Sequence, residues 1–488
     1  MMTTNVTHFF EMEKPGYCRI ARIAVQNFRC FPEFIVDLNS DEREIQKNGQ
    51  IKTVGPLTVI VARNGMGKTT VLDAIRIAYG TFTSGFSYKS FANIQRQDIR
   101  IEKDNSQQVF PVVIDAVAAL ANTPFEWIRS IQAEGQQTKT LVKNKNNLGI
   151  RRIDGNPFKD FQRKFQGAYE ETDPFVLPII ASYGTNRLWK KTNKKDKRRN
   201  LVTNRTWGYS SCLDAAANYT EAFGWLTDAI IARLNEKQVG IQQNQTLNDQ
   251  LQAVESALTT VLEQEGYCPP LHLDPFFQEL AIVQKNSDNK ISVPVSQMSD
   301  GVKAVFFMVA DIAFRCAKLN PLFKENAAKL TPGIVLIDEV DMHLHPSWQQ
   351  KVLDTLQWAF PQIQFIVTTH SPQVVSSVPS ESVRIIENGN VYSACGSEGA
   401  DSARILEDIF GTSSFPKENR QRKRLKQYLD LVYAGKWKDP ETQQLRSELD
   451  KVYCGKEPLL TDADLHIENE KWEAEHPDRN DDIEDDSK

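Results

Sequence analysis

Short, fully apolar runs mark the core of this chain. They occupy residues 57–61, 333–340 and 364–370, and each is typical of a strand buried on both faces of a parallel sheet. A helix is expected at about 347–359, between the last two runs. Because a strand–helix–strand connection joins parallel neighbours, the pattern predicts an α/β fold with a parallel sheet at its centre.

Elsewhere the pattern alternates with a period of two or repeats with a helical period. Alternation over 18–38 predicts two short strands, and further strands are expected at 109–118 and 175–184. Residues 212–265 and 302–318 look helical. In the first of these helical segments, one apolar stripe consists of Leu247, Leu251, Val254, Leu258 and Leu262.

Composition indicates a globular protein and excludes several classes. The chain has 488 residues, of which 40% are hydrophobic and 25% charged. No apolar run approaches the roughly 18 residues of a membrane span, and the first residues lack the pattern of a secretory signal. The seven cysteines are scattered without a CxxC pair, so neither a disulfide framework nor a zinc cage is expected. We therefore expect a cytoplasmic protein with reduced thiols.

The net charge of −5 hides a basic stretch at residues 187–205, which contains nine basic residues and one acid. Trp189, Trp207 and Tyr209 lie in or beside it. Lysine and arginine neutralise phosphates and aromatic rings stack on unpaired bases, so one interpretation is a nucleic-acid contact. A solvated charged loop is the other interpretation, and the sequence does not choose between them.

Two more charged segments follow in the last quarter of the chain. Residues 417–426 form a second basic run on an expected helix, where a solvated helix face is the favoured interpretation. Residues 473–488 contain eight acids and two basic residues. The last dozen residues lack an apolar period, and we expect them to be disordered.

Residues 62–70 read ARNGMGKTT and match the end of the phosphate-binding loop pattern G-x-x-x-x-G-K-[ST]. Ala62 replaces the first glycine, which a tight turn tolerates if φ stays negative. The loop follows an apolar strand and opens an amphipathic helix, so its N–H groups can hold phosphate oxygens. The predicted nucleotide-binding residues are Asn64, Gly65, Gly67, Lys68, Thr69 and Thr70.

The chemistry expected at this loop is ATP binding with Mg²⁺. Lys68 should reach the β and γ phosphates, and Thr69 should ligate Mg²⁺, with Thr70 as a lesser candidate. Residues 334–339, IVLIDE, end an apolar strand in two acids. Asp338 is the expected Mg²⁺ ligand, directly or through water, and Glu339 the expected base that polarises the attacking water.

The order of these motifs resembles that of the SMC/RecF-like ABC ATPases, especially the OLD-like group. Residues 298–302, MSDGV, resemble the family signature L-S-G-G-Q at Ser299 and Gly301, and depart from it at Asp300 and Val302. The resemblance implies that Ser299 and Gly301 touch the γ-phosphate bound by a partner subunit. The alternative is a simple helix N-cap by Ser299.

The same resemblance implies further residues around the nucleotide. Asp341 matches the D-loop position, and His370 stands at the place of the switch histidine that contacts the γ-phosphate. Gln97 is the candidate for the Q-loop glutamine, with Gln95 left open as the alternative. Arg29 resembles the arginine that SMC-like heads place near the nucleotide, although a plain surface arginine fits equally well.

His343 and His345 in DEVDMHLHP suggest a metal pair from their type alone. They lie two positions apart and lack other obvious ligands in the sequence. No metal site is therefore expected at these histidines, and the expected metal ligands are Thr69 and Asp338.

The resemblance is finer to the PtuA ATPases of Septu-type anti-phage systems, which also occur beside retron reverse transcriptases. It rests on residues 177–189, 299–304, 338–346 and 401–412. It implies a homodimer of ATPase heads or a higher oligomer, and a PtuB-like HNH nuclease as partner. In a retron it also implies contact with reverse transcriptase and its DNA–RNA product.

The expected fold is an ABC-type ATPase head, with a parallel sheet core, an antiparallel β subdomain, a mostly helical insertion and a helical C-terminal extension. The predicted segments are 15–100, the N-lobe with the phosphate loop; 101–186, the rest of that lobe, ending in a core strand; 187–290, the basic loop and helical insertion; 291–398, the C-lobe with the signature, the acid pair and His370; 399–475, the helical extension; and 476–488, the acidic tail.

Three other functions compete with a defence ATPase. A RecF/SMC-like repair ATPase that clamps DNA is the main alternative, supported by the stretch 187–205. A self-contained OLD-type nuclease needs an acid-bearing strand pattern that residues 380–488 lack. A transporter ATPase is disfavoured because the signature glutamine is missing and the middle insertion is large.

Overall fold

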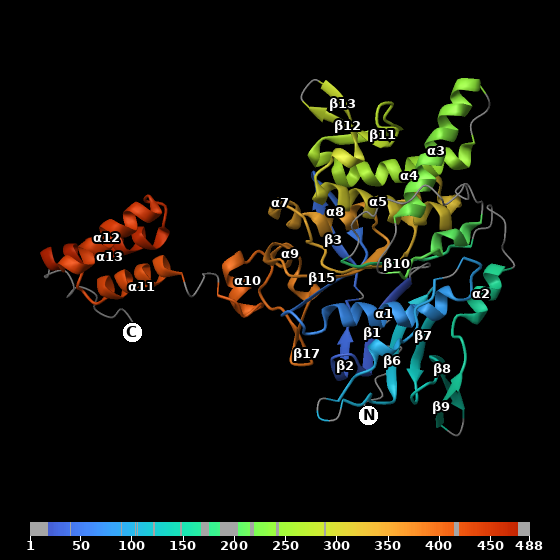
Figure 1. The fold of residues 1–488 in the computed structure, drawn as a ribbon, viewed down its shortest axis with the longest axis horizontal. Coiled ribbons are helices and arrows are strands. Elements are labelled where there is room, and N and C mark those ends of the chain that lie inside the picture. The colour runs from blue at the N-terminus through green and yellow to red at the C-terminus, as the bar shows by residue number, and fades with distance from the viewer. Residues whose placement is uncertain are drawn as a thin grey trace, which may run out of the picture. The chain divides into compact units, whose positions relative to one another are not determined.

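The structure is a computed structural model that divides into two compact units, Met1–Ile405 and Leu406–Lys488. Figure 1 shows the ribbon with its elements labelled. The basic stretch at 187–203 and the acidic tail at 477–488 lie outside the described residues. The structure describes residues 18–39, 41–88, 90–102, 104, 106–120, 123–146, 149–166, 175–185, 204–214, 219–240, 244–286, 289–413 and 419–476.

A six-stranded sheet forms the core of the first unit, in the order β10-β14-β15-β5-β16-β17. Strands β10 to β16 in this order run parallel, and β17 returns antiparallel to β16. Every residue of β10, β14, β15 and β5 is buried, which confirms the parallel α/β core predicted from the apolar runs. The strands are β5 (Leu57–Ala62), β10 (Ile179–Tyr183), β14 (Gly333–Ile337), β15 (Ile363–Thr369), β16 (Val383–Glu387) and β17 (Asn390–Ser393).

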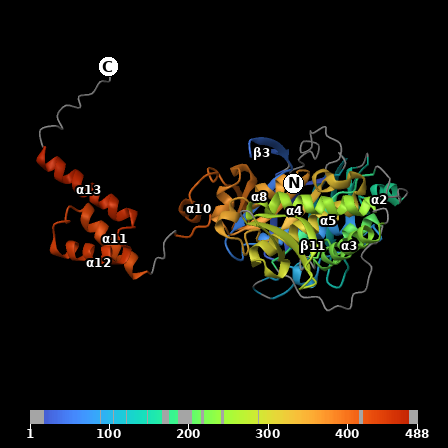
Figure 2. The ribbon, with the colours of Figure 1, turned by 90° about the horizontal axis from the view of Figure 1, so that it is seen from above.

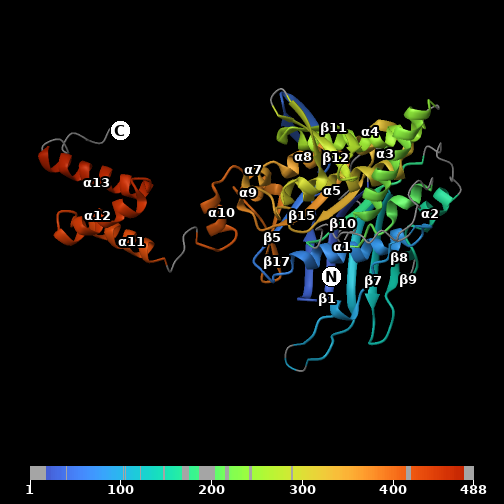
Figure 3. The same cartoon turned by 45° about the horizontal axis from the view of Figure 1, so that its top comes forward.

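A second, antiparallel sheet has the order β2-β1-β6-β7-β8-β9. Helix α1 (Lys68–Thr83) contacts strands of both sheets and lies between them (Figure 3), so nearly its whole length is buried. The indole of Trp127 donates to the carbonyl of Ala78 in α1 at 3.0 Å. The strands are β1 (Cys18–Phe28), β2 (Phe31–Asp37), β6 (Val112–Leu120), β7 (Thr123–Ile131), β8 (Lys139–Asn146) and β9 (Gly149–Asp154).

One buried amide joins the two sheets directly. Gln364 of β15 accepts a hydrogen bond from the N–H of Ile20 at 2.8 Å and donates to the carbonyls of Ile20 and Asn39, both at 2.9 Å. These three hydrogen bonds pair the oxygen and the NH₂ group of the Gln364 amide, and leaving a buried amide unpaired would cost free energy. The orientation of the antiparallel sheet on the core sheet is thereby fixed.

The middle of the chain is partly helical and partly β. Helices α3 (Thr220–Val239) and α4 (Gln245–Leu262) form as predicted, and the apolar stripe of α4 is buried. Helices α5 (Asp300–Leu319) and α8 (Val352–Ala359) also lie where the sequence predicts them.

Residues 267–294 form strands for which the sequence analysis predicted no element. They form a three-stranded antiparallel sheet of β11 (Tyr267–Leu273), β12 (Leu280–Asn286) and β13 (Asn289–Pro294). Strand β13 is largely exposed. Strand β11 contains the consecutive prolines Pro269 and Pro270, and proline within an apolar run weakens the strand signal of a sequence.

Trp207 and Tyr209 are core residues and not base-stacking residues. They lie in the 3-10 helix η3 (Arg205–Tyr209) and are 6% and 0% exposed. Trp207 packs edge-on against Phe314 of α5, and the Tyr209 hydroxyl donates to the carbonyl of Pro178 at 2.8 Å. The nucleic-acid role considered for these two rings is therefore wrong, because neither offers a free face.

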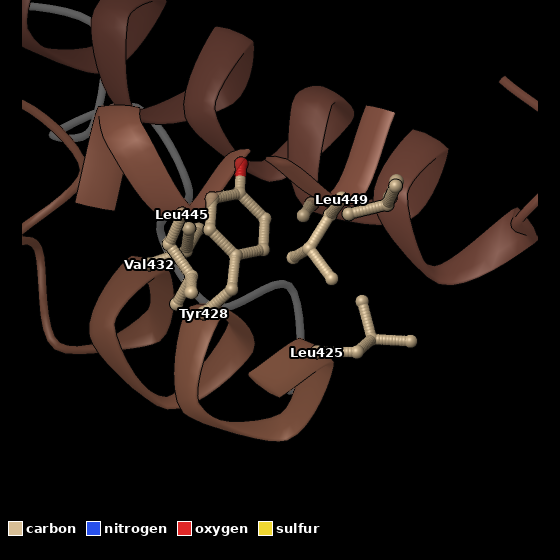
Figure 4. Packing of buried hydrophobic residues seen from close by; sticks show 7 residues of the cluster. Leu425, Tyr428, Val432, Leu445 and Leu449 are labelled. Carbon is tan, nitrogen blue, oxygen red and sulfur yellow. The ribbon is translucent and has the colours of Figure 1, made fainter. Parts of the chain in front are cut away.

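The second unit contains a three-helix assembly of α11 (Arg420–Tyr433), α12 (Pro440–Tyr453) and α13 (Pro458–Glu475), preceded by α10 (Ser402–Asp408) at the boundary. Arg422 and Arg424 of the basic run pair with glutamates of the other helices, Glu457 and Glu448. Among the described residues, no helix is long and apolar enough to cross a membrane. The core, drawn in Figure 4, is made of Leu425, Tyr428, Val432, Leu445, Leu449, Leu460 and Ala463.

Candidate active site

The phosphate loop connects the end of β5 to the start of α1. Gly65 and Gly67 adopt left-handed backbone, with φ of 79° and 95°, which glycine adopts without strain. A Cβ on Gly67 would lie 2.3 Å from the ring of Phe31 and 2.9 Å from Sγ of Cys30, whereas a Cβ on Gly65 would meet nothing within 4 Å. The loop is therefore packed on one side and open on the other. Ala62 lies in β5, where extended backbone suits alanine.

Lys68 is held at the mouth of this loop. Its ammonium donates to the carbonyl of Ala62 at 3.0 Å and lies 2.6 Å from Nε2 of His370. Burial lowers the pKa of Lys68, although the nearby carboxylates, led by that of Asp338, favour its charged form. Because an ammonium only donates, a neutral His370 accepts from it through Nε2.

Asp338 follows β14, and its carboxylate accepts hydrogen bonds from two threonine hydroxyls. The Thr69 hydroxyl of α1 donates to Oδ2 at 2.9 Å, and the Thr368 hydroxyl of β15 donates to Oδ1 at 2.5 Å. The N–H of Asp338 donates to the carbonyl of Tyr183 at 2.8 Å. Thr70, in contrast, is buried, and its hydroxyl lies 3.9 Å from Sγ of Cys30. Thr69, and not Thr70, therefore faces the predicted metal-binding acid.

Glu339 has left-handed backbone with φ of 47°, an uncommon conformation for a residue with a side chain and one that clusters at functional sites. Its N–H donates to the Thr368 hydroxyl at 2.8 Å. One threonine thus binds both members of the acid pair, as the acceptor for Glu339 and the donor to Asp338.

Asp341 and His370 are joined through β15. The Thr369 hydroxyl donates to Oδ1 of Asp341 at 2.6 Å, and the N–H of His370 donates to the same oxygen at 3.4 Å. Burial lowers the pKa of His370, and the charge of Lys68 lowers it further. The imidazole is therefore predominantly neutral at pH 7.

The signature residues lie at the start of α5, beside the segment that follows the acid pair. Ser299 caps the helix, accepting from the N–H of Val302 at 3.4 Å. A Cβ on Gly301 would lie 2.4 Å from the carbonyl of His343. Both residues line a pocket of about 670 Å³ with His343 and Trp348, and the lining of that pocket contains no residue of the phosphate loop.

Arg29 is engaged in a partly buried ionic network. Its guanidinium binds Asp73 of α1 at 2.5 Å and Asp98 at 2.7 Å. Asp98 also accepts from the N–H of Gln95 at 2.8 Å, so this network ties α1 to the turn that carries both glutamine candidates. Gln95 and Gln97 are both exposed, and the geometry does not choose between them.

The two histidines at 343 and 345 are exposed. His345 caps α7 (Pro346–Gln349), with its Nδ1 as acceptor from the N–H of Ser347 at 3.3 Å. Within the described ranges, no group of three or more His, Cys, Asp or Glu side chains is placed to hold a metal ion.

The sequence analysis missed Thr368 and Thr369 as site residues. Both occur in the segment TTHSP, which it recognised for His370 only. Two consecutive threonines at the end of a buried strand could have identified them, because a buried hydroxyl requires a hydrogen-bond partner. Asp73 and Asp98 were missed for another reason, since their role depends on contacts with Arg29, distant in the chain.

A phosphate loop at the end of one parallel strand, with an acid pair and a histidine at the ends of the next two, defines a P-loop ATPase. Comparison with known proteins supports the same class. The chain belongs to the family described as "AAA domain, putative AbiEii toxin, Type IV TA system", whose model matches residues 57–376.

Three curated relatives are similar to this chain. "Retron Ec83 probable ATPase" of Escherichia coli is 27% identical over 94% of this chain and 88% of its own length. "Retron Vc95 probable ATPase" of Vibrio cholerae serotype O1 biovar El Tor is 24% identical over 80% and 81%. "Septu protein PtuA" of Bacillus mycoides is 24% identical over 72% of this chain but 38% of its own length. These relatives confirm the resemblance to retron and Septu ATPases.

Solved SMC heads are more distant. The SMC head bound to the C-winged helix domain of ScpA has a TM-score of 0.44 and 16% identity, covering 77% of this chain and 97% of its own. The SMC head domain from Thermotoga maritima has a TM-score of 0.38 and 13% identity, covering 77% and 98%.

Nucleotide binding should raise the pKa of His370. Phosphate oxygens at Lys68 add negative charge beside the imidazole and stabilise its protonated form. Binding then takes up a proton, so ATP should bind more tightly as the pH falls from the raised pKa of His370 in the complex toward its lowered pKa in the free chain. The measurement is an NMR titration of labelled histidines with and without a non-hydrolysable ATP analogue. Exposed His476, which lies in the second unit, serves as the internal control. An unchanged or lower pKa for His370 would contradict its place beside the phosphates.

Proposed function

We propose that this chain is the ATP-binding and ATP-hydrolysing subunit of an anti-phage defence complex, and that its ATP cycle regulates a PtuB-like HNH nuclease. The support for the defence setting is the similarity to relatives named as retron ATPases and Septu PtuA. The support for hydrolysis is one geometric observation. Groups from α1, β14 and β15 converge at the phosphate loop, with Thr69 at 2.9 Å from Asp338 and Lys68 at 2.6 Å from His370.

The residues present suit ATP with Mg²⁺. The hydroxyl of Thr69 and the carboxylate of Asp338 are hydrogen-bonded to each other. Such a pair of oxygen groups is the protein ligand set that Mg²⁺ commonly has beside phosphate oxygens. When bound, the ion would neutralise charge that develops on the phosphates. No other described cluster competes for this role.

The chain's own groups supply the remaining steps. The loop N–H groups and Lys68 bind and orient the phosphates. Glu339 polarises the attacking water and accepts its proton, while Thr368 holds its main chain in place. The main-chain N–H of His370 donates to Asp341 and holds the residue in place. Once Lys68 has turned to the nucleotide, Nε2 is released from Lys68 and, when protonated, can donate toward the terminal phosphate.

Glu339→Gln should slow ATP hydrolysis by about 10²–10⁴-fold and leave ATP binding intact, because it removes the base but keeps the side-chain shape. The measurements are phosphate release and fluorescent ATP binding. The matched control is Glu387→Gln, which changes an exposed glutamate at the end of β16, also a parallel core strand. Unchanged hydrolysis in Glu339→Gln, or an equal loss in the control, would defeat this mechanism.

We also place two heads around each nucleotide. Ser299 and Gly301 line a pocket that lacks any phosphate-loop residue, so a second copy is the natural source of the loop. In a two-fold dimer, each loop would then face the partner's signature.

Mixing two inactive variants tests this arrangement. Lys68→Met and Ser299→Arg should each abolish hydrolysis, and an equal mixture should recover about a quarter of wild-type activity. Half of the dimers are then mixed, and each mixed dimer contains one site built from two intact halves. Phosphate release on mixing is the measurement, after dissociation of each homodimer in dilute solution. No recovery would show that a single chain carries both halves of its site.

The complex itself is tested by mild affinity purification of the chain from its native host. An HNH protein should co-purify, and a reverse transcriptase with a small DNA–RNA product should accompany it if the setting is a retron. Mass spectrometry and nuclease-sensitive staining identify these components. A lone ATPase dimer on host DNA would favour the repair-clamp alternative instead.

A further inference from the structure

A lysine cluster surrounds Trp358 on the first unit, at a place that no nucleotide-site motif occupies. We call it the Trp358 surface, and its four lysines come from three segments that are far apart in the sequence. The hairpin of β3 (Arg43–Lys47) and β4 (Gln50–Val54) supplies two, α6 (Ala327–Leu330) one, and the residue before α8 one. Figure 2 shows β3 beside α8. The lysines are Lys47, Lys52, Lys329 and Lys351.

Two hollows flank the indole. One, of about 490 Å³, is lined by Lys52, Lys329 and the Trp358 ring, and its lining contains no acid. The other, of about 160 Å³, is lined by Lys47, Lys351 and again Trp358. The cluster therefore presents two separate pairs of cations and not one convergent pocket.

The ammonium groups are held by neutral partners. Lys52 donates to the carbonyl of Trp358 at 2.9 Å and lies 5.2 Å from the ring centroid. Lys47 donates to the carbonyl of Thr260 at 3.3 Å, and Lys351 to the side chain of Gln264 at 3.4 Å. Carbonyl groups orient a charge but do not cancel it, so the cluster stays cationic.

The nearby acids leave an excess of positive charge. Asp354, which lines the smaller hollow, is paired with Arg43. Glu263 favours the charged form of Lys47, so one lysine has an acid within electrostatic reach. In the larger hollow the opposite holds, because burial lowers the pKa of Lys52 and the like charge of Lys329 lowers it further. Two ammonium groups without an acid between them are a site for an anion.

We propose that the Trp358 surface binds the phosphate backbone of a single-stranded nucleic acid. A free phosphate would fill one hollow only, whereas a strand carries a charge at every nucleotide and reaches both pairs of lysines. An aromatic side chain between cations is typical of surfaces that follow single strands. The inference rests on the proposed function for the source of this strand, the nucleic acid of the defence complex.

The test is binding of a fluorescein-labelled DNA of about 30 nucleotides to the full chain, followed by anisotropy over a range of salt. Lys52→Glu with Lys329→Glu should weaken binding at least about tenfold near 0.1 M salt. It should also lower the slope of log K against log salt by about 1.4, since each single-strand phosphate contributes about 0.7. ATP hydrolysis without DNA should stay at the wild-type rate, which also shows that the variant folds.

A matched pair of lysines provides the control. Lys285 and Lys290 lie directly opposite one another in the β12–β13 hairpin, and both are exposed. Reversing both to glutamate changes the net charge by the same amount and should leave affinity and salt slope near wild type. Lys52→Gln with Lys329→Gln, the milder variant, should give a smaller loss in the same direction.

Three results would overturn the proposal. These are wild-type binding by the Lys52/Lys329 variant, an equal loss in the Lys285/Lys290 control, or binding of poly-glutamate by a wild-type chain that binds no DNA. The last would make the surface a contact for an acidic protein. Loss of hydrolysis in Glu339→Gln is measured separately, so failure of the proposed ATPase and failure of this surface are distinguishable.

Discussion

The parallel pairing of β5, β15 and β14 is the constraint on which the rest of the site depends. Parallel strands place their carboxyl ends at one edge of the sheet, and here those ends lead into the phosphate loop, His370 and Asp338. The register pairs Val61 with Thr369 and Val367 with Ile337. Ala62 and His370, which follow Val61 and Thr369, therefore lie side by side. The ammonium of Lys68 can thus contact both the carbonyl of Ala62 and the imidazole of His370.

Threonine hydroxyls convert this edge into a defined arrangement of charges. Thr368 bridges the acid pair and Thr369 holds Asp341, so two consecutive residues of β15 orient three carboxylate-bearing positions on the neighbouring segment. Hydrogen bonds to carboxylates are short and directional, so these hydroxyls orient the carboxylates of Asp338 and Asp341, whereas Glu339 is held through its main-chain N–H. The strained backbone of Glu339 is tolerated within this network.

A second set of contacts fixes the helix that carries the loop. Helix α1 lies between two sheets, and the packing of Gly67 against Phe31 leaves its first turn little room to move. Arg29 binds Asp73 on that helix and Asp98 on the glutamine-bearing turn. These contacts join the helix that carries the phosphate loop to the antiparallel sheet and to the turn at residues 96–98. The lysines around Trp358 are built differently, from partners that orient charge without neutralising it.

The parallel core, the phosphate loop, the acid pair and His370 could all be predicted from the sequence. Each is a contiguous pattern whose chemistry follows from local spacing, and Ala62 changes none of it. Tertiary structure alone decided that Thr69 and not Thr70 faces Asp338, that Thr368 organises the acids, and that Trp207 and Tyr209 are buried. The three-stranded sheet at 267–294 and the clustering of the four lysines around Trp358 are also visible only in the tertiary structure. These features depend on contacts between residues far apart in the chain, which periodicity and motif spacing do not encode.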